Sequence, residues 1–218
     1  MRQPVGRIHS MAMHESQSLL IEMQACRSRE FMNFLSPLII RTFGDDEAFS
    51  ADNLYASYTT VKPDFIRVDA DEVTYPLHVI LRYELEKQLI AGDISVYNLP
   101  EAWDAAMKHY LGLSTKDDYK DGVMQDVHWP SGAFGYFPSY TLGSLTAAQM
   151  FASAKNAYPD ILEGLNHGNF TSLYKWLIEN VHSKASSISF DQLMREATGE
   201  SLDPNYFIAH IKQKYLSV

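Results

Sequence analysis

The sequence has few features that would place it outside the cytoplasm. Its only cysteine among 218 residues is Cys26, which excludes an intrachain disulfide and a metal site built from several thiolates. No apolar run is long enough to cross a bilayer, and the first residues lack the apolar core of a secretory signal. We therefore expect a cytoplasmic protein without a membrane-spanning segment.

Positive charge is also scarce. The chain has 18 Lys and Arg against 27 Asp and Glu, a formal net charge of -9. Nucleic-acid binding depends on clustered cations, so this balance argues against a nucleic-acid partner. The hydrophobic content of 46% is ordinary for a globular protein with a core, and the length suits a single domain.

Strand signals are scarce as well. Apolar residues recur at helical spacing along most of the chain, and Gly, Pro and Asp separate the periodic segments. The sequence therefore predicts a mostly α fold with at most a small β element. The expected helices cover about 12–35, 51–59, 70–91, 100–111, 139–157, 160–166, 170–182, 190–198 and 204–216.

Three boundaries carry specific expectations. Residues 61–68 are interpreted as extended chain and a candidate edge strand because they contain Pro63. Asp69 and Glu72 have the spacing of a capping box at the start of the 70–91 helix. Gly92 is placed as the C-terminal cap of that helix.

One stretch, Gly122 to Gly143, is too polar for a core element and too aromatic for an ordinary loop. Its glycines and prolines require turns, and a loop of this kind is a common place for reactive side chains. The alternative is a buried aromatic loop whose polar groups satisfy one another. The hydrogen-bonding side chains in question are Gln125, Asp126, His128, Tyr136 and Tyr140.

Two upstream residues could complete a hydrolytic site. Glu15 could bind zinc, and Arg67 could hold a carboxylate through two parallel hydrogen bonds. His and Tyr side chains could stabilise an oxyanion. Each has a simpler explanation: His14-Glu15 could lie on a helix surface, and Arg67 could pair with Asp69 or Asp71.

A complete catalytic zinc site is not evident. Such sites need three protein ligands, and a common helical source of two of them is His-Glu-x-x-His. None of the eight histidines begins this motif. His14 is followed by Glu15, but Ser18 stands where the second histidine belongs.

Several motifs nevertheless give the chain a specific resemblance. In order and approximate spacing they resemble the carboxypeptidase Taq (M32) family of metallocarboxypeptidases, over nearly the whole chain. The motifs are His14-Glu15-Ser16-Gln17-Ser18, Ile66-Arg67-Val68-Asp69-Ala70-Asp71-Glu72, Gly122-Val123-Met124-Gln125-Asp126-Val127-His128-Trp129 and Phe134-Gly135-Tyr136-Phe137-Pro138-Ser139-Tyr140, with Ala197-Thr198-Gly199 near the end.

This resemblance implies a helical fold with a deep groove, a small β element near the site and a homodimer. It also implies removal of single residues from peptide C-termini with zinc, or sometimes cobalt. Glu15 matches the family's third metal ligand, and Arg67 matches the arginine that holds the terminal carboxylate of the substrate. His128 matches the histidine that stabilises or protonates the tetrahedral intermediate, with Gln125 and Asp126 orienting it. Either Tyr136 or Tyr140 matches the oxyanion-binding tyrosine.

The sequence departs from the family pattern at one point. Family members are much longer, and their His-Glu-x-x-His helix precedes the segment that contains Glu15. The chain therefore resembles their C-terminal part, without two zinc histidines and the general-base glutamate. We expect the isolated chain to be inactive as a peptidase and to bind zinc poorly. The alternative is a non-catalytic homologue that binds peptide ends or dimerises.

Overall fold

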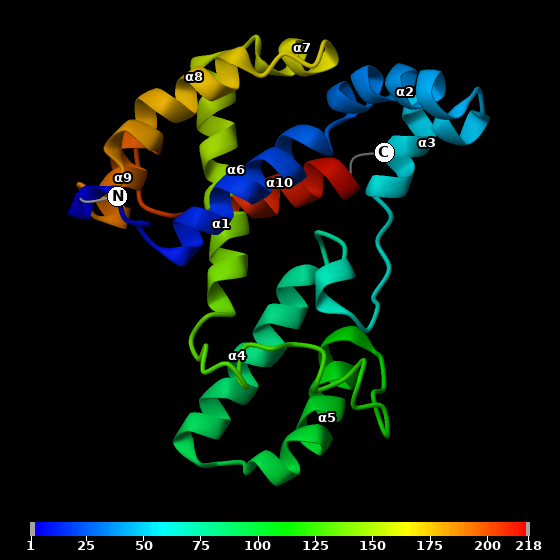
Figure 1. Ribbon diagram of the computed structural model, residues 1–218, viewed down its shortest axis with the longest axis vertical. Coiled ribbons are helices and arrows are strands. Elements are labelled where there is room, and N and C mark those ends of the chain that lie inside the picture. The colour runs from blue at the N-terminus through cyan, green and yellow to red at the C-terminus, as the bar shows by residue number, and fades with distance from the viewer. Residues whose placement is uncertain (1–2, 217–218) are drawn as a thin grey trace. The chain divides into compact units, whose positions relative to one another are not determined.

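Residues 3–216 are described by a computed structural model, in which they form α-helices joined by short turns and loops (Figure 1). No β-strand occurs within this range, so the mostly α prediction is confirmed and the candidate strand at 61–68 is not found. None of the described helices is long and apolar enough to cross a membrane. Backbone contacts divide the chain into two compact units, Met1–Thr60 with Leu142–Val218, and Val61–Thr141.

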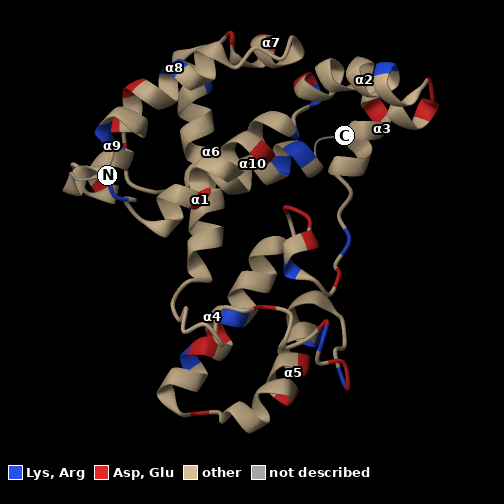
Figure 2. Ribbon diagram, viewed as in Figure 1, with Lys and Arg blue, Asp and Glu red and all other residues tan. Residues whose placement is uncertain are grey.

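The first unit is assembled around α6. Figure 2 shows this helix with almost no charged residue along its length, and Lys155 is the only one. The helices of this unit are α1 (Met11–Leu19), α2 (Arg29–Phe43), α3 (Ala51–Tyr58), α6 (Pro138–Ala157, from Leu142 on), α7 (Ile161–Asn166), α8 (Thr171–Asn180), α9 (Phe190–Thr198) and α10 (Asn205–Tyr215). The buried Met150 and Phe151 of α6 belong to a core cluster with side chains of α1, α7, α8 and α9.

The expected helix at 12–35 is divided into separate segments. The Ser10 hydroxyl caps α1, and a π-helical segment, Leu20–Cys26, continues from it. The Ser28 hydroxyl then accepts a hydrogen bond from the Phe31 backbone N–H at 3.2 Å and starts α2. A serine hydroxyl that satisfies the free N–H groups of a new helix favours a boundary at that position, which the apolar periodicity does not reveal. The α2 helix continues through Pro37 to Phe43, beyond the expected end at about residue 35.

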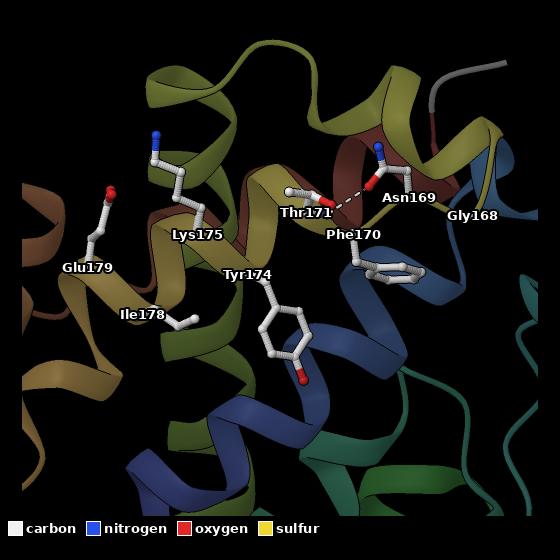
Figure 3. A pocket seen from close by; sticks show the side chains of 8 residues that line it. All are labelled: Gly168, Asn169, Phe170, Thr171, Tyr174, Lys175, Ile178 and Glu179. Atoms are coloured by element: carbon white, nitrogen blue, oxygen red, sulfur yellow. Dashed lines mark hydrogen bonds between the residues drawn. The ribbon is translucent and has the colours of Figure 1, made fainter.

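The outer side of α8 carries a shallow groove of about 630 Å³ (Figure 3). Its Tyr174 and Ile178 side chains are more than half exposed. At one end, the Asn169 side-chain oxygen accepts a hydrogen bond from the Thr171 backbone N–H at 2.9 Å. This groove is a surface feature of the first unit.

The second unit is built on α4 (Tyr75–Ala91) and α5 (Leu99–Leu111). Leu81 and Leu85 from α4 share a buried cluster with Trp103 and Met107 from α5. Gly92 follows α4 with φ of +78°, a left-handed conformation that glycine adopts without a Cβ clash, so the predicted C-cap is confirmed. A long loop then leads from α5 to Phe137.

The predicted capping box at Asp69 and Glu72 is wrong. Asp69 lies in a short 3-10 turn, Arg67–Asp69, and α4 begins only at Tyr75. Asp71 provides the local hydrogen bonds instead, because its Oδ1 accepts from the backbone N–H groups of Val73 and Thr74 at 2.9 Å each. An aspartate that binds its own following backbone stabilises a turn ahead of the helix.

Candidate functional site

The second unit brings six of the seven predicted site residues into one region. The short turn before α4 carries Arg67, the long loop carries Gln125, Asp126, His128 and Tyr136, and the first turn of α6 carries Tyr140. Glu15 lies on α1 in the first unit.

Arg67 is 5% exposed, and its guanidinium is fixed on two sides. Nε and Nη2 donate to Asp126 Oδ1 at 3.0 and 2.8 Å, and Nη1 donates to the Tyr75 hydroxyl at 2.9 Å. The Tyr140 ring lies against the guanidinium, with 4.6 Å from the Arg67 Cζ to the ring centroid. A guanidinium has five N–H donors, and these bonds use three of them. One N–H on Nη1 and one on Nη2 therefore have no acceptor among the described residues.

A second arginine, which was not among the predicted site residues, shares Asp126 and Gln125 with Arg67. Arg82 on α4 is 0% exposed, and its Nε donates to Asp126 Oδ2 at 2.6 Å. Its Nη2 donates to Gln125 Oε1 at 2.7 Å, and its Cζ lies 4.6 Å from the ring centroid of Trp103. Burial lowers the pKa of Arg82 to about 10, which leaves it charged at neutral pH.

Asp126 is the shared counter-ion of these two arginines. Burial alone would raise the pKa of its carboxyl group, but Arg82 and Arg67 outweigh burial and hold that pKa below its usual value. For Arg67, burial acts to lower the pKa, whereas the hydrogen bond and charge of Asp126 raise it overall. At neutral pH, the cluster therefore contains two cations and one anion with little access to water.

Gln125 positions the backbone next to this cluster. Its Oε1 accepts from the Arg67 backbone N–H at 2.9 Å as well as from Arg82. Its Nε2 donates to the carbonyl groups of Phe65 and Asp121 at 3.0 and 2.7 Å. No described hydrogen bond joins Gln125 to His128, so its observed contacts serve Arg67 and the loop.

His128 and Tyr140 form a hydrogen-bonded pair, with 2.8 Å between the His128 Nε2 and the Tyr140 hydroxyl. The His128 Nδ1 lies 3.7 Å from Asp126 Oδ1, which is beyond normal hydrogen-bond distance. Burial lowers the pKa of His128, so the imidazole is neutral at pH 7. The Tyr136 ring packs against both partners, at 5.4 Å from His128 and 5.3 Å from Tyr140 between centroids.

Glu86 ties α4 to the aromatic loop. This buried carboxylate accepts from the Trp129 indole Nε1 at 2.7 Å and from the Gly135 backbone N–H at 2.5 Å. Gly135 has a φ of +77°, which a residue with a Cβ adopts only under strain. These bonds hold the loop at the residue that follows His128 and at the residue that precedes Tyr136.

Glu15 lies where α1 meets α6 within the first unit. A Cβ built at Gly143 would lie 2.9 Å from both Cβ and Cγ of Glu15, and 3.3 Å from its backbone carbonyl carbon. Glycine at this position therefore allows the two helices to approach closely beside the Glu15 side chain.

We expect Gly143→Ala to destabilise the protein by about 1–3 kcal/mol, because the added methyl group would overpack this contact. In a helix without such a contact, the same change would stabilise the protein by about 1 kcal/mol. The sign of the stability change therefore shows whether the two helices approach closely at Gly143. Urea unfolding measures the difference. The control is Asn156→Ala, an exposed position on the same helix, where no loss of stability is expected. A stabilised Gly143→Ala protein would contradict the close approach.

Residues 1–215 match the family described as carboxypeptidase Taq (M32) metallopeptidase. The chain belongs to the M32 family. It is 39% identical over 215 residues to thermostable carboxypeptidase 1 of Thermus thermophilus and 36% identical over 213 residues to thermostable carboxypeptidase 1 of Pyrococcus furiosus. Metallocarboxypeptidase 1 of Trypanosoma cruzi is a solved structure with 41% identity and a TM-score of 0.95.

The match to M32 proteins is complete for this chain but not for its relatives. The chain is covered to 99% and 98% by the Thermus and Pyrococcus alignments, which span 42% of each relative. For the Trypanosoma structure the corresponding values are 99% and 45%. The chain thus corresponds to less than half of the length of these proteins, namely their C-terminal portion.

Membership of the M32 metallopeptidases implies a divalent metal, which needs metal-binding side chains. Within residues 3–216, no three His, Cys, Asp or Glu side chains are grouped so that they could hold a metal ion. The described residues therefore do not make a metal site by themselves, and Glu15 could contribute only one ligand.

Proposed function

We propose that this chain provides the part of an M32 metallocarboxypeptidase that recognises the free carboxylate at a peptide C-terminus. The observation that supports this is the Arg67 guanidinium, which Asp126 and Tyr75 orient while one N–H on each terminal nitrogen stays available. Two such donors match the two oxygens of a carboxylate. Burial also favours binding, because hydrogen bonds to charged groups are stronger away from water.

The neighbouring side chains would act on the scissile bond. His128 and one of Tyr136 and Tyr140 are proposed to hydrogen-bond the oxygen that becomes negative in the tetrahedral intermediate. The Tyr140 hydroxyl already bonds the His128 ring, whereas the Tyr136 hydroxyl has no described partner. Asp126 and Gln125 are proposed to position Arg67, to which both are bonded.

The metal is the second part of the proposal. Glu15 is assigned as one ligand of zinc, or of cobalt, in the manner implied for the family. A bound metal would supply an activated water for peptide hydrolysis. Because residues 3–216 do not offer a three-ligand group, we assign no hydrolytic step to this chain by itself. Release of C-terminal residues would need ligands from outside the described residues.

A second candidate function is a module that binds peptide ends without cleaving them. The intact Arg67 cluster, together with the lack of a three-ligand group in residues 3–216, favours it for the isolated chain. Activity assays with added zinc or cobalt distinguish the two candidates. Binding without release of residues supports the module, and metal-dependent release supports the peptidase. A homodimer, with either function, remains a proposal based on the family.

The test of carboxylate recognition compares two ligands by calorimetry. We expect an N-acetylated dipeptide with a free carboxylate to bind at least tenfold more tightly than the same dipeptide with a C-terminal amide. Arg67→Met should abolish this preference, because a charged hydrogen bond contributes about 1.5–3 kcal/mol.

Two further variants make that result interpretable. Arg27→Met is the control, since Arg27 pairs with Glu22 in the first unit and should leave the preference unchanged. Arg67→Lys keeps the positive charge for Asp126 but removes the two parallel donors, and should still weaken binding. Equal affinity for acid and amide in the unmodified chain would remove Arg67 from this role.

A further inference from the structure

Arg82 contacts both of the loop side chains that hold Arg67. Its Nε donates to Asp126 Oδ2 at 2.6 Å, and its Nη2 donates to Gln125 Oε1 at 2.7 Å. The same two side chains accept from Arg67, because Asp126 Oδ1 binds the guanidinium and Gln125 Oε1 binds the backbone N–H. The two acceptors that the loop offers to Arg67 are therefore also held by Arg82.

The position of Arg82 is set by the helices α4 and α5. Its Nη1 donates to the His78 carbonyl, one turn earlier on α4, at 2.8 Å. The Trp103 ring of α5 lies against the guanidinium and belongs to the buried core between the two helices. A side chain fixed by packed helices holds its partners more precisely than a loop can. Arg82 thus gives the loop residues Gln125 and Asp126 a fixed point of attachment.

Asp126 divides its two oxygens between the arginines. Oδ1 accepts from Nε and Nη2 of Arg67, and Oδ2 accepts from Nε of Arg82. The terminal torsion of an aspartate has a broad energy minimum, so contacts at one oxygen leave the carboxylate plane free to turn. The bond from Arg82 fixes the second oxygen, and with it the plane against which the Arg67 guanidinium is aligned.

Arg82 also adds a positive charge to the cluster. Among the described residues, Asp126 is the only carboxylate that pairs with either arginine. Arg67 and Asp126 alone would be neutral together and would offer an incoming carboxylate little net attraction. With Arg82, two buried cations share one anion, which is an unfavourable state unless a second anion arrives. A substrate carboxylate at Arg67 would complete the second ion pair.

Arg82 does not meet a ligand itself, because it is 0% exposed. We propose that Arg82 is a positioning residue for carboxylate recognition, an inference that rests on the proposed function of Arg67. It aligns Arg67 through Asp126 and Gln125, and it leaves the cluster with one anion too few.

Two variants of Arg82 test this proposal, again by calorimetry with the dipeptide acid and its amide. Arg82→Lys keeps the charge, but an ammonium group cannot reproduce the planar fork that reaches Asp126 and Gln125 together. Arg82→Gln removes the charge and keeps one donor group. In both variants, the preference for the free carboxylate should fall from at least tenfold to threefold or less. The affinity for the amide should change less than twofold.

A second measurement follows Arg67 directly. Its Nε–H signal in ¹H–¹⁵N NMR is identified by its loss in Arg67→Met, and it should shift or broaden in both Arg82 variants without ligand. Leu99→Ala is the control for lost stability. It removes buried packing between α4 and α5, but a leucine side chain makes no hydrogen bond to the cluster. This variant should be less stable and keep both the tenfold preference and the Arg67 signal.

The outcomes separate positioning from a merely structural role. If both folded Arg82 variants kept the tenfold preference and the Arg67 signal, the proposal would be overturned while the role of Arg67 would stand. If Arg82→Lys kept the preference and only Arg82→Gln lost it, charge alone would explain the effect, and alignment through hydrogen bonds would be wrong. Equal affinity of the unmodified chain for acid and amide would instead overturn the proposed function, and this inference with it.

Discussion

Asp126→Asn is expected to lower the free energy of unfolding by about 3–5 kcal/mol, because it leaves two buried guanidinium groups without their counter-ion. Arg67 and Arg82 have side-chain exposures of 6% and 0%, so water cannot replace the carboxylate. For a chain of this size, such a loss lowers the melting temperature by about 10 °C or more. Thermal and urea unfolding measure it directly.

The control for this prediction is Asp191→Asn. Asp191 pairs with Arg195 on α9, and both side chains are 60% exposed, so its loss should leave the free energy of unfolding nearly unchanged. A double variant sharpens the test. Asp126→Asn combined with Arg82→Met should lose less stability than the sum of the two single variants, because one buried charge leaves with its partner. A cost below about 1 kcal/mol for Asp126→Asn alone would contradict a buried ionic cluster.

His78 is expected to make the protein less stable by about 3 kcal/mol at pH 4 than at pH 7. This residue on α4 is fully buried. Burial, followed by the charges of Arg82 and Arg67, lowers the pKa of His78 from 6.5 to about 4, against the smaller opposing effects of Asp126 and of a weak contact with the Asp64 backbone.

The direction follows from proton binding. Between pH 4 and 6.5, the unfolded chain takes up a proton at His78 that the folded chain does not, so stability falls as the pH falls. The reduced pKa values of His128 and His182 act in the same direction. The lowered pKa of Asp126 also acts in this direction, but only below about pH 5, where the unfolded carboxyl group begins to take up a proton. Above about pH 5, the pH dependence is therefore set by histidines.

Urea unfolding at several pH values between 4 and 7 tests this expectation. His78→Leu should remove most of the pH dependence, whatever its effect on stability at pH 7. The control is His109→Gln, an exposed histidine on α5 of the same unit, which should keep the unmodified pH dependence. If His78→Leu retained the full slope, the burial of a neutral imidazole at this position would be wrong.

The predictions that succeeded rest on local chemistry. Gly92 ends α4 in the left-handed conformation, as predicted for a residue without a Cβ. The polar residues of the central stretch were found because their density was unusual for a loop. Such signals depend on neighbours in sequence, so they can be read without a fold.

The residues that the sequence analysis missed depend on distant partners. His78, Arg82 and Glu86 recur every four residues along α4, each one position after a leucine, namely Leu77, Leu81 and Leu85. On a helix this places them beside the core face. Periodicity alone cannot distinguish a solvated polar stripe from a buried one, so it does not identify Arg82 and Glu86 as buried ionic residues.

The sequence by itself determined the helical class, most helix ends, the family and the candidate residues Arg67, Gln125, Asp126, His128, Tyr136 and Tyr140. The tertiary structure decided which charges are buried together. Asp126 reaches Arg82 across 44 positions of the chain, and Trp129 reaches Glu86 across 43. A charge is stabilised in the interior only by a partner brought to it through folding, so the sequence could select Asp126 but only the fold could show that Arg82 is its partner.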